Sequence, residues 1–249
     1  MNILFTICGR AGSKGIKNKN IRPFCGKLLP YYSLAAIELY IRKHTGEGEY
    51  DIALSTDSPE LIRIVNDNPF RPVDVVERSP ELAGDTVAKK DVIWDLLVQM
   101  EKRKNCTYDL VVDLDLTSPL RTCDDVENLI ETSLKTGADI TYSVTTSRRN
   151  PYFNQVCRGE HGFHTVCQGQ FVARQQAPVV YDMNASLYAY KPAHLKNGGG
   201  FFEGYFEAIE MYDTAVLDLD HEEDFELMQV IAEYLFTKKE GFKEIYDMI

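Results

Sequence analysis

The alternation of two hydrophobic periods along residues 1–145 constrains the fold most strongly. Runs of β-branched and apolar residues, typical of strands, alternate with stretches whose apolar residues recur every three or four positions, typical of amphipathic helices. We expect strands at Asn2–Cys8, Tyr50–Ser55, Val73–Glu77, Tyr108–Leu114 and Asp139–Thr145, and helices at Ser33–Lys43, Pro59–Asn66, Thr86–Lys102 and Asp124–Lys135. This order predicts an α/β fold in which helices cover both faces of a parallel sheet.

The alternation breaks between residues 146 and 182. Two strands, Tyr152–Cys157 and Phe163–Ala173, are expected to form a hairpin inserted into the domain. Because so apolar an arm is hard to keep soluble alone, we expect it to pack on a second subunit and form a homodimer. Beyond it we expect strands at Ala185–Tyr190 and Ala215–Leu219 and helices at Glu203–Met211 and Glu222–Phe236. The sequence therefore predicts a single domain over residues 1–249, with residues 146–182 as a dimerisation arm.

Charge and composition exclude several classes of function. The 249 residues carry 27 Lys and Arg against 38 Asp and Glu, and the net charge of −11 repels nucleic acid and anionic lipid. No run of about 18 apolar residues is present and the first strand is too short for a signal sequence, so we expect a cytoplasmic protein. None of the six cysteines belongs to a CxxC pair, which predicts reduced, buried side chains.

The segment CGRAGSKGIKNKN, residues 8–20, combines three glycines with four cations directly after the first strand. Glycines let backbone amides approach an oxyanion closely, and Arg10, Lys14, Lys17 and Lys19 supply positive charge, so the loop suits a triphosphate. It is not a P-loop, because Gly15 follows Lys14 where a P-loop has Ser or Thr. The alternative interpretation is a solvated surface turn.

Two pairs of aspartates stand two residues apart at predicted strand ends. Asp218 and Asp220 therefore point to the same side, as a magnesium site requires, although the residues after them also suit the start of a helix. Asp113 and Asp115 repeat the spacing in DLDLTSPLRT, ahead of a second possible helix cap.

A further set of possible metal ligands spans the predicted hairpin, namely Cys157, His161, His164 and Cys167. Two thiolates and two imidazoles can bind zinc, but this spacing matches no known zinc module. A turn rich in Gly and His, with two packed cysteines, is the preferred interpretation.

Six segments, in this order, resemble the CMP-sialic acid synthetase family of cytidylyltransferases: GRAGSKGIKNKN, LSTDS, ERSPELAGDT, TSPLRT, RQQAP followed by MNASLYAY, and DLDHEEDF. The resemblance spans nearly the whole chain. It implies a Rossmann-like subunit, a homodimer with exchanged arms, and a Mg²⁺-dependent reaction. In that reaction the anomeric hydroxyl of a nonulosonic acid attacks the α-phosphorus of CTP and pyrophosphate leaves.

The resemblance also implies roles for individual residues. Arg10 and Lys14 would neutralise phosphate charge in the transition state, and Asp220 would polarise or deprotonate the attacking hydroxyl. The expected metal ligands are Asp218 and Asp220. The expected nucleotide-binding residues are Gly9, Arg10, Ala11, Gly12, Ser13, Lys14, Lys19, Asn20, Asp57, Arg78 and Lys89. The expected sugar-binding residues are Asp115, Thr117, Ser118, Arg121, Arg174, Gln175 and Asn184.

The chain departs from the family pattern at several positions, among them two of these residues and Ala185, the neighbour of Asn184. Asp115 replaces a sugar-facing amide by an acceptor-only carboxylate, Lys89 stands where relatives can offer a small hydroxyl to the pyrimidine, and Ala185 replaces a glycine. Asp115 and Lys89 keep open a nucleotidyltransferase that acts on another sugar acid or a sugar 1-phosphate, with another NTP. A metal-dependent glycosyltransferase and a non-catalytic nucleotide sensor are further alternatives.

Overall fold

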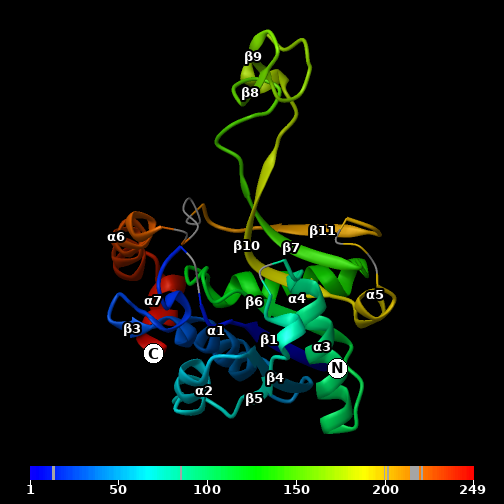
Figure 1. Ribbon diagram of the computed structural model, residues 1–249, viewed down its shortest axis with the longest axis vertical. Helices are drawn as coiled ribbons and strands as arrows, with labels where there is room; N and C mark the ends of the chain where they lie inside the picture. The colour runs from blue at the N-terminus through cyan, green and yellow to red at the C-terminus, as the bar shows by residue number, and fades with distance from the viewer. Residues whose placement is uncertain (13–14, 85, 199, 201, 214–218, 220) are drawn as a thin grey trace.

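The centre of the structure, a computed structural model, is a seven-stranded sheet (Figure 1). The structure describes residues 1–249 except 13–14, 85, 199, 201, 214–218 and 220. The strands of this sheet are β1 (Asn2–Cys8), β4 (Glu49–Thr56), β5 (Asp74–Glu77), β6 (Leu110–Leu114), β7 (Ile140–Thr146), β10 (Tyr181–Tyr190) and β11 (Phe206–Glu210). They lie in the order β11-β7-β10-β6-β1-β4-β5.

The sheet is mainly parallel, as predicted. Strands β6, β1, β4 and β5 pair in parallel, and so do β7 and β11. Strand β10 lies antiparallel between β6 and β7. This arrangement brings the carboxyl ends of β1, β4 and β6 to one edge, where ligands of open α/β sheets bind.

Helices cover both faces of the sheet. They are α1 (Leu29–Lys43), α2 (Pro59–Asn66), α3 (Lys89–Lys104), α4 (Cys123–Thr136), α5 (Pro192–Lys196), α6 (Glu222–Lys238) and α7 (Glu240–Met248) among the described residues. Strand β1 illustrates how the core is divided: Ile3, Phe5 and Ile7 pack with α1 and α4, whereas Leu4 faces α3. Because both faces of β1 are buried, the strand is a continuous apolar run, which is the feature that predicted it.

The predicted hairpin is present as β8 (Val156–Gly159) and β9 (Gly162–Thr165), with both strands shorter than expected. It lies between β7 and β10 and projects from the body of the molecule (Figure 1). A second, two-stranded hairpin consists of β2 (Pro23–Phe24) and β3 (Lys27–Leu28).

Some predictions are wrong. The expected helix Glu203–Met211 is instead strand β11, because its residues pair in parallel with the edge of β7, and tertiary pairing outweighs local propensity. The helical pattern of residues 86–102 also places Trp94 on the apolar side, which predicts a core residue, but its side chain is 45% exposed. The side chain of Cys157, which was expected to be buried, is exposed as well. The expected strand Ala215–Leu219 lies outside the described residues except for Leu219.

Candidate functional site

A cavity of about 400 Å³ lies at the carboxyl ends of β1 and β6. Its walls come from the loop after β1, from residues 78–92 and from the turn after β6. It brings together many of the side chains that the sequence assigned to substrate binding: Gly9, Arg10, Lys19, Asn20, Arg78, Lys89, Asp115 and Thr117. Residues far apart in the sequence therefore share one site.

The loop after β1 is held by its own backbone and by Asp57. The Gly9 amide donates to the Ser55 carbonyl at 3.1 Å, and the Ala11 amide donates to Asp57 Oδ1 at 2.7 Å. Asn20 Nδ2 donates to the Arg10 carbonyl at 3.0 Å. Asp57 is thus a support of the loop in this structure, while Ala11 and Gly12 line an adjoining hollow with Arg10 and Asn20.

Gly9 occupies a position with no room for a side chain. A Cβ there would lie 2.6 Å from Leu61 Cδ2 and 2.7 Å from Leu116 Cδ1. Both leucines are buried in the core. The loop can therefore approach the sheet edge this closely only because the residue is glycine.

Arg78 reaches the cavity from the loop after β5 and is largely buried. Its Nε donates to Ser55 Oγ at 3.1 Å, and a terminal nitrogen donates to the Ser55 carbonyl at 3.0 Å. These bonds fix the guanidinium at the end of β4, where the Ser55 carbonyl also accepts from the Gly9 amide.

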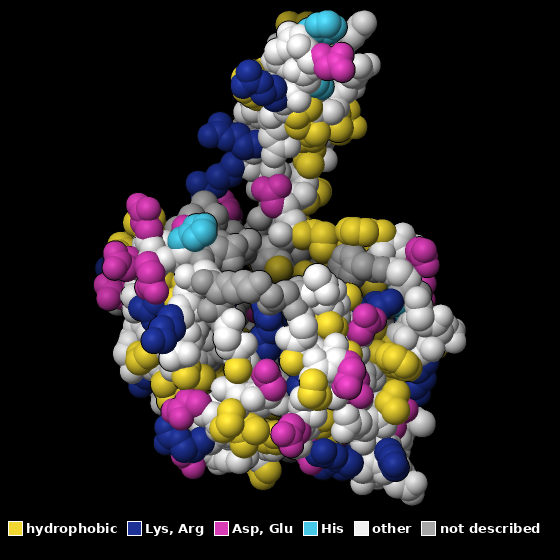
Figure 2. Space-filling view, in the orientation of Figure 1, with side chains coloured by type: hydrophobic (Ala, Val, Ile, Leu, Met, Phe, Trp, Pro, Cys, Tyr) yellow, Lys and Arg dark blue, Asp and Glu magenta, His cyan; other side chains and the backbone are white. Residues whose placement is uncertain are grey.

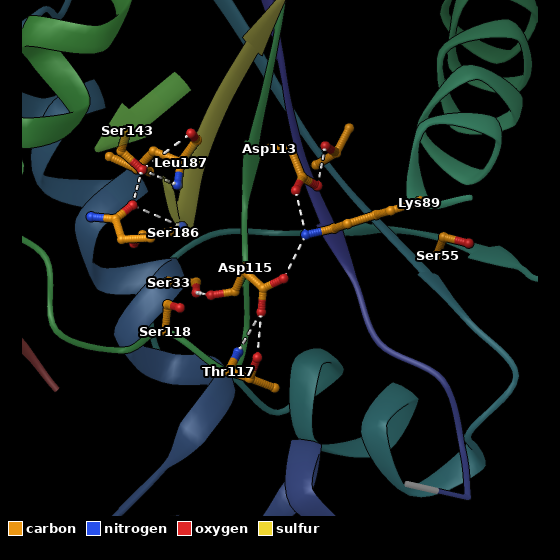
Figure 3. A network of polar contacts seen from close by, with 12 residues as sticks. Ser33, Ser55, Lys89, Asp113, Asp115, Thr117, Ser118, Ser143, Ser186 and Leu187 are labelled. Carbon is orange, nitrogen blue, oxygen red and sulfur yellow. Dashed lines mark hydrogen bonds and ion pairs between the residues drawn. The ribbon is translucent and has the colours of Figure 1, made fainter. Parts of the chain in front are cut away.

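Lys89, the first residue of α3, extends to two carboxylates (Figure 3). Its ammonium lies 2.7 Å from Asp113 Oδ2 and 2.7 Å from Asp115 Oδ2. Burial would raise the pKa of Asp115, but the Lys89 charge and the bonds donated by Thr117 outweigh burial and lower this pKa to about 2. The two aspartates do share a side, as their spacing predicted, and an ammonium holds them together.

Arg121 is fully buried beneath the turn after β6. It donates to Ser33 Oγ at 2.8 Å and to Ser186 Oγ at 3.2 Å, and it also binds the carbonyls of Asp115 and Ser118. These contacts brace the backbone that carries Asp115, Thr117 and Ser118.

The other predicted sugar-binding residues lie around β10. Asn184 is buried, and its side-chain oxygen accepts from Ser143 Oγ and, at 3.3 Å, from the Ser186 amide. Gln175 is exposed in a short 3₁₀ helix, Arg174–Gln176. Next to Asn184, Ala185 has φ +53°, a left-handed conformation that favours glycine.

Ser13, Lys14, Asp218 and Asp220 lie outside the described residues. Residues near them in the sequence are described, and those that follow β1 contact those that precede and begin α6. Lys19 Nζ donates to the carbonyl of Leu219, the residue between the two aspartates, at 2.7 Å. Arg22 forms an ion pair with Glu222 at 2.5 Å, at the start of α6. The loop after β1 therefore contacts the segment that leads into α6.

The possible zinc ligands on the hairpin are not gathered. Cys157 Sγ lies 3.2 Å from His164 Nε2 on the neighbouring strand. No group of three or more His, Cys, Asp or Glu side chains within the described part of the chain could hold a metal ion. In the same part of the chain, no helix has both the length and the apolar character needed to cross a bilayer.

The sequence did not assign several residues of the cavity. They are Cys8, Gly15, Leu82, Gly84, Val87 and Val92. Leu82, Val87 and Val92 add apolar side chains to the lining, and Cys8, the last residue of β1, lies near Asp113 and Lys89. Burial, and after it the Asp113 charge, raises the pKa of the Cys8 thiol, so the cavity contains a neutral thiol rather than a thiolate. Two of these residues had a sequence signal that could have placed them in the cavity. Cys8 ends a predicted strand, and Val92 lies one helical turn after Lys89.

Comparisons with known proteins identify the family of the chain. A family model for cytidylyltransferases matches residues 4–233. The chain is 34% identical over 238 residues to the post-translational flagellin modification protein B of Campylobacter coli, covering 95% of this chain and 96% of the relative. It is 32% identical over 230 residues to the CMP-N,N'-diacetyllegionaminic acid synthase of Campylobacter jejuni, covering 92% and 94%.

The fold also matches solved structures. A CMP:2-keto-3-deoxy-manno-octonic acid synthetase complexed with CTP superposes with a TM-score of 0.64, covering 94% of this chain and 99% of that chain. Sequence identity to it is 13%, so this likeness concerns the fold alone.

Proposed function

This chain belongs to the cytidylyltransferase family, and we propose that it transfers CMP from CTP to the anomeric hydroxyl of a nonulosonic acid, releasing pyrophosphate. The acid would be of sialic, legionaminic or pseudaminic type, in keeping with the name of the Campylobacter jejuni relative. The observation that carries the proposal is the cavity, in which Arg10, Lys19 and Arg78 line the same space as Asn20 and Thr117. Several fixed cations around one space suit a polyphosphate. We also propose that the reaction takes place in the cytoplasm, where CTP is available.

The chemistry we propose is a direct displacement at the α-phosphorus. Phosphoryl-type transfer depends mainly on positioning and on neutralising charge, so it needs fixed cations rather than a covalent nucleophile. Arg10 and Lys14 would neutralise the phosphates. The raised pKa of the Cys8 thiol, caused first by burial, supports a mechanism without a thiolate nucleophile in this cavity.

Magnesium is part of the proposal, with Asp218 and Asp220 as its protein ligands. Hard carboxylate oxygens suit Mg²⁺, which would offset charge on the triphosphate. Asp220 would polarise or deprotonate the attacking hydroxyl. The bond from Lys19 to the Leu219 carbonyl supports this assignment, because it ties the sequence between the two aspartates to the phosphate-binding loop.

The sugar acid would lie between the turn after β6 and the residues around β10. Arg174 is suited to its carboxylate, since a guanidinium binds carboxylates in a two-pronged geometry. Thr117, Ser118, Gln175 and Asn184 would complete this side of the pocket, with Arg121 bracing the turn from below. Asp115 would accept from a donor on the substrate.

We propose a homodimer in which the arm, residues 146–182, packs on the second subunit. Hydrophobic and basic side chains are exposed along the arm (Figure 2). The apolar ones include Val156, Phe163, Val166 and Val172, and the side chain of Phe163 is 69% exposed. An exposed apolar surface of this kind is typical of a protein interface.

The test is pyrophosphate release from the full-length protein with each NTP, Mg²⁺ and a panel of nonulosonic acids. We expect release only with CTP and an acid of this class. The substitutions Lys14→Ala and Asp220→Asn should each abolish turnover, and the matched controls Lys17→Ala and Glu223→Gln, at exposed positions, should not. No release from CTP with any nonulosonic acid would refute the proposal.

A second candidate is favoured by Lys89 and Asp115, which form an ion pair in the cavity at two positions where the resemblance implies neutral groups. It is a nucleotidyltransferase that acts on another sugar acid or a sugar 1-phosphate, with a different NTP. Release with such a pair of substrates in the same panel would favour it.

A further inference from the structure

Strand β10 is irregular where it passes the turn after β6. Its pairing with β7 shifts register between Met183 and Tyr188, and Ala185, within this bulge, has φ +53°. A Cβ is disfavoured in the left-handed region, so glycine would hold this conformation with less strain. The family pattern has glycine at this position. The chain therefore keeps a methyl group where the backbone favours none.

The bulge is fixed to β7 by hydrogen bonds on both sides of Ala185. The hydroxyl of Ser143 donates to Asn184 Oδ1 and accepts from the Leu187 amide at 3.0 Å (Figure 3). Asn184 Oδ1 also accepts from the Ser186 amide at 3.3 Å, so the Asn184 side chain spans Ala185. Ala185 cannot change its φ angle without breaking these bonds.

The bulge is also fixed to the turn after β6. The Ser186 carbonyl accepts from the Asp115 amide at 3.1 Å, and Ser186 Oγ accepts from Arg121 Nε at 3.2 Å. Asp115 and Thr117 of this turn line the cavity. Ala185, one residue before Ser186, therefore lies close to the edge of the cavity, in a backbone conformation that its neighbours impose.

Ala185 is the part of the bulge that a ligand can reach. Asn184, Ser186 and Leu187 are buried, with at most 5% of their surface exposed, whereas Ala185 is partly exposed. The Asn184 amide is engaged inside the protein, because its oxygen accepts two hydrogen bonds and its Nδ2 lies 3.4 Å from Met211 Sδ. A ligand beside this bulge therefore meets Ala185, whose side chain is a methyl group.

On the premise of the proposed function, in which the sugar acid lies between the turn after β6 and β10, we propose that Ala185 selects among sugar acids by the size and polarity of the substituent beside it. Its methyl group occupies space that glycine would leave free, and it offers no hydrogen-bond donor or acceptor. A compact, apolar substituent packs against it, whereas a larger one overlaps it and a polar one loses its partners. Backbone strain that persists in a folded protein is concentrated at functional sites, which supports this role.

The experiment compares nonulosonic acids that differ by one methylene group. Each acid of the panel is extended at one substituent at a time, by a longer N-acyl chain or by an O-methyl group on one hydroxyl. The ratio kcat/KM is measured from pyrophosphate release by the full-length protein with CTP and Mg²⁺. We expect the wild type to discriminate at least about 10-fold against extension of one substituent, since one methylene group in a fitted site changes kcat/KM by about 10- to 200-fold.

The substitution Ala185→Gly should reduce this discrimination about 10-fold, because it returns the space of the methyl group to the acid. The KM for CTP should stay within about two-fold, since the proposed contact is to the acid alone. The matched control is Ala193→Gly, at an exposed alanine on α5, which should leave the order of the acids unchanged.

Unfolding in urea separates selection from a loosened fold. Ala185→Gly should leave the midpoint of unfolding unchanged or raise it, because glycine suits the left-handed conformation. Ala193→Gly should lower the midpoint, because glycine weakens a helix. A midpoint lowered as much in Ala185→Gly as in Ala193→Gly would assign the methyl group to packing within the protein and overturn the inference.

Two kinetic results would also overturn it: a wild type that accepts every extended acid as well as its parent, or the same discrimination in Ala185→Gly and Ala193→Gly. In both cases pyrophosphate release with the parent acids would leave the proposed function standing. No release with any nonulosonic acid would refute the proposed function, and this inference with it.

Discussion

The hydrogen bond of Lys19 tests the proposal that the loop after β1 stabilises the segment that contains Asp218 and Asp220. Its ammonium donates to the carbonyl of Leu219 at 2.7 Å, across 200 residues of sequence. A charge-assisted hydrogen bond contributes about 1.5–3 kcal/mol, and partial exposure at this site reduces the expected value to about 1–2 kcal/mol. The substitution Lys19→Met keeps the aliphatic length and removes the bond.

The effect should be local. Hydrogen exchange of the ligand-free protein, followed in peptides that cover residues 219–226, should be about 5- to 30-fold faster in Lys19→Met than in the wild type, because opening of this segment costs less. The Mg²⁺ concentration that gives half-maximal pyrophosphate release should rise in parallel. Lys17→Met, at an exposed position in the same loop, is the matched control. Exchange and Mg²⁺ dependence that are the same in both variants would refute the reasoning.

Three further predictions concern stability and assembly. Gly9→Ala should lower the free energy of unfolding in urea by about 1–3 kcal/mol, because its Cβ would overlap Leu61 and Leu116; a loss fully additive with that of Leu116→Ala would contradict this cause. The pKa of Asp115, lowered to about 2 although burial opposes it, means that its stabilisation is present above pH 4 and is lost as the pH falls towards 2. When the pH is lowered from 5 to 2.5, the free energy of unfolding in urea should therefore fall by about 2 kcal/mol more in the wild type than in Asp115→Asn. An equal decrease in both proteins would argue against a stabilising ion pair between Lys89 and Asp115. Phe163→Asp, on the arm, should convert the proposed dimer to a monomer in light scattering, whereas Glu160→Gln, also exposed on the arm, should not; two dimers would exclude Phe163 from the interface.

Segments with a clear hydrophobic period were predicted well. The bounds of β1 and α2 match the structure, because β1 is a continuous apolar run buried on both faces of the sheet and α2 buries one face at helical spacing. Strand β11 was mistaken for a helix, since its five residues are too few for the two periods to differ. Trp94 was placed in the core, yet the buried stripe of α3 passes through Ile93 and Leu97 and leaves it outside.

The candidate site was predicted in part. The position of the loop after β1 at a strand end indicated where Arg10, Lys19 and Asn20 would gather, and the cavity contains all three. The ion pairs of Lys89 could not be predicted, because its partners lie 24 and 26 residues further along the chain on another element. From the sequence, Lys89 and Asp115 were two separate departures from the family pattern, and only the structure shows that they form an ion pair.

The sequence by itself determined the succession of strands and helices, the inserted hairpin and the family, because periodicity and ordered motifs are local properties of the chain. Only the tertiary structure decided that β10 runs antiparallel between β6 and β7, that Lys89 joins Asp113 to Asp115, and that Lys19 reaches Leu219. These are contacts between distant segments. Their free energy depends on which surfaces meet after the core has formed, and no local pattern records that choice.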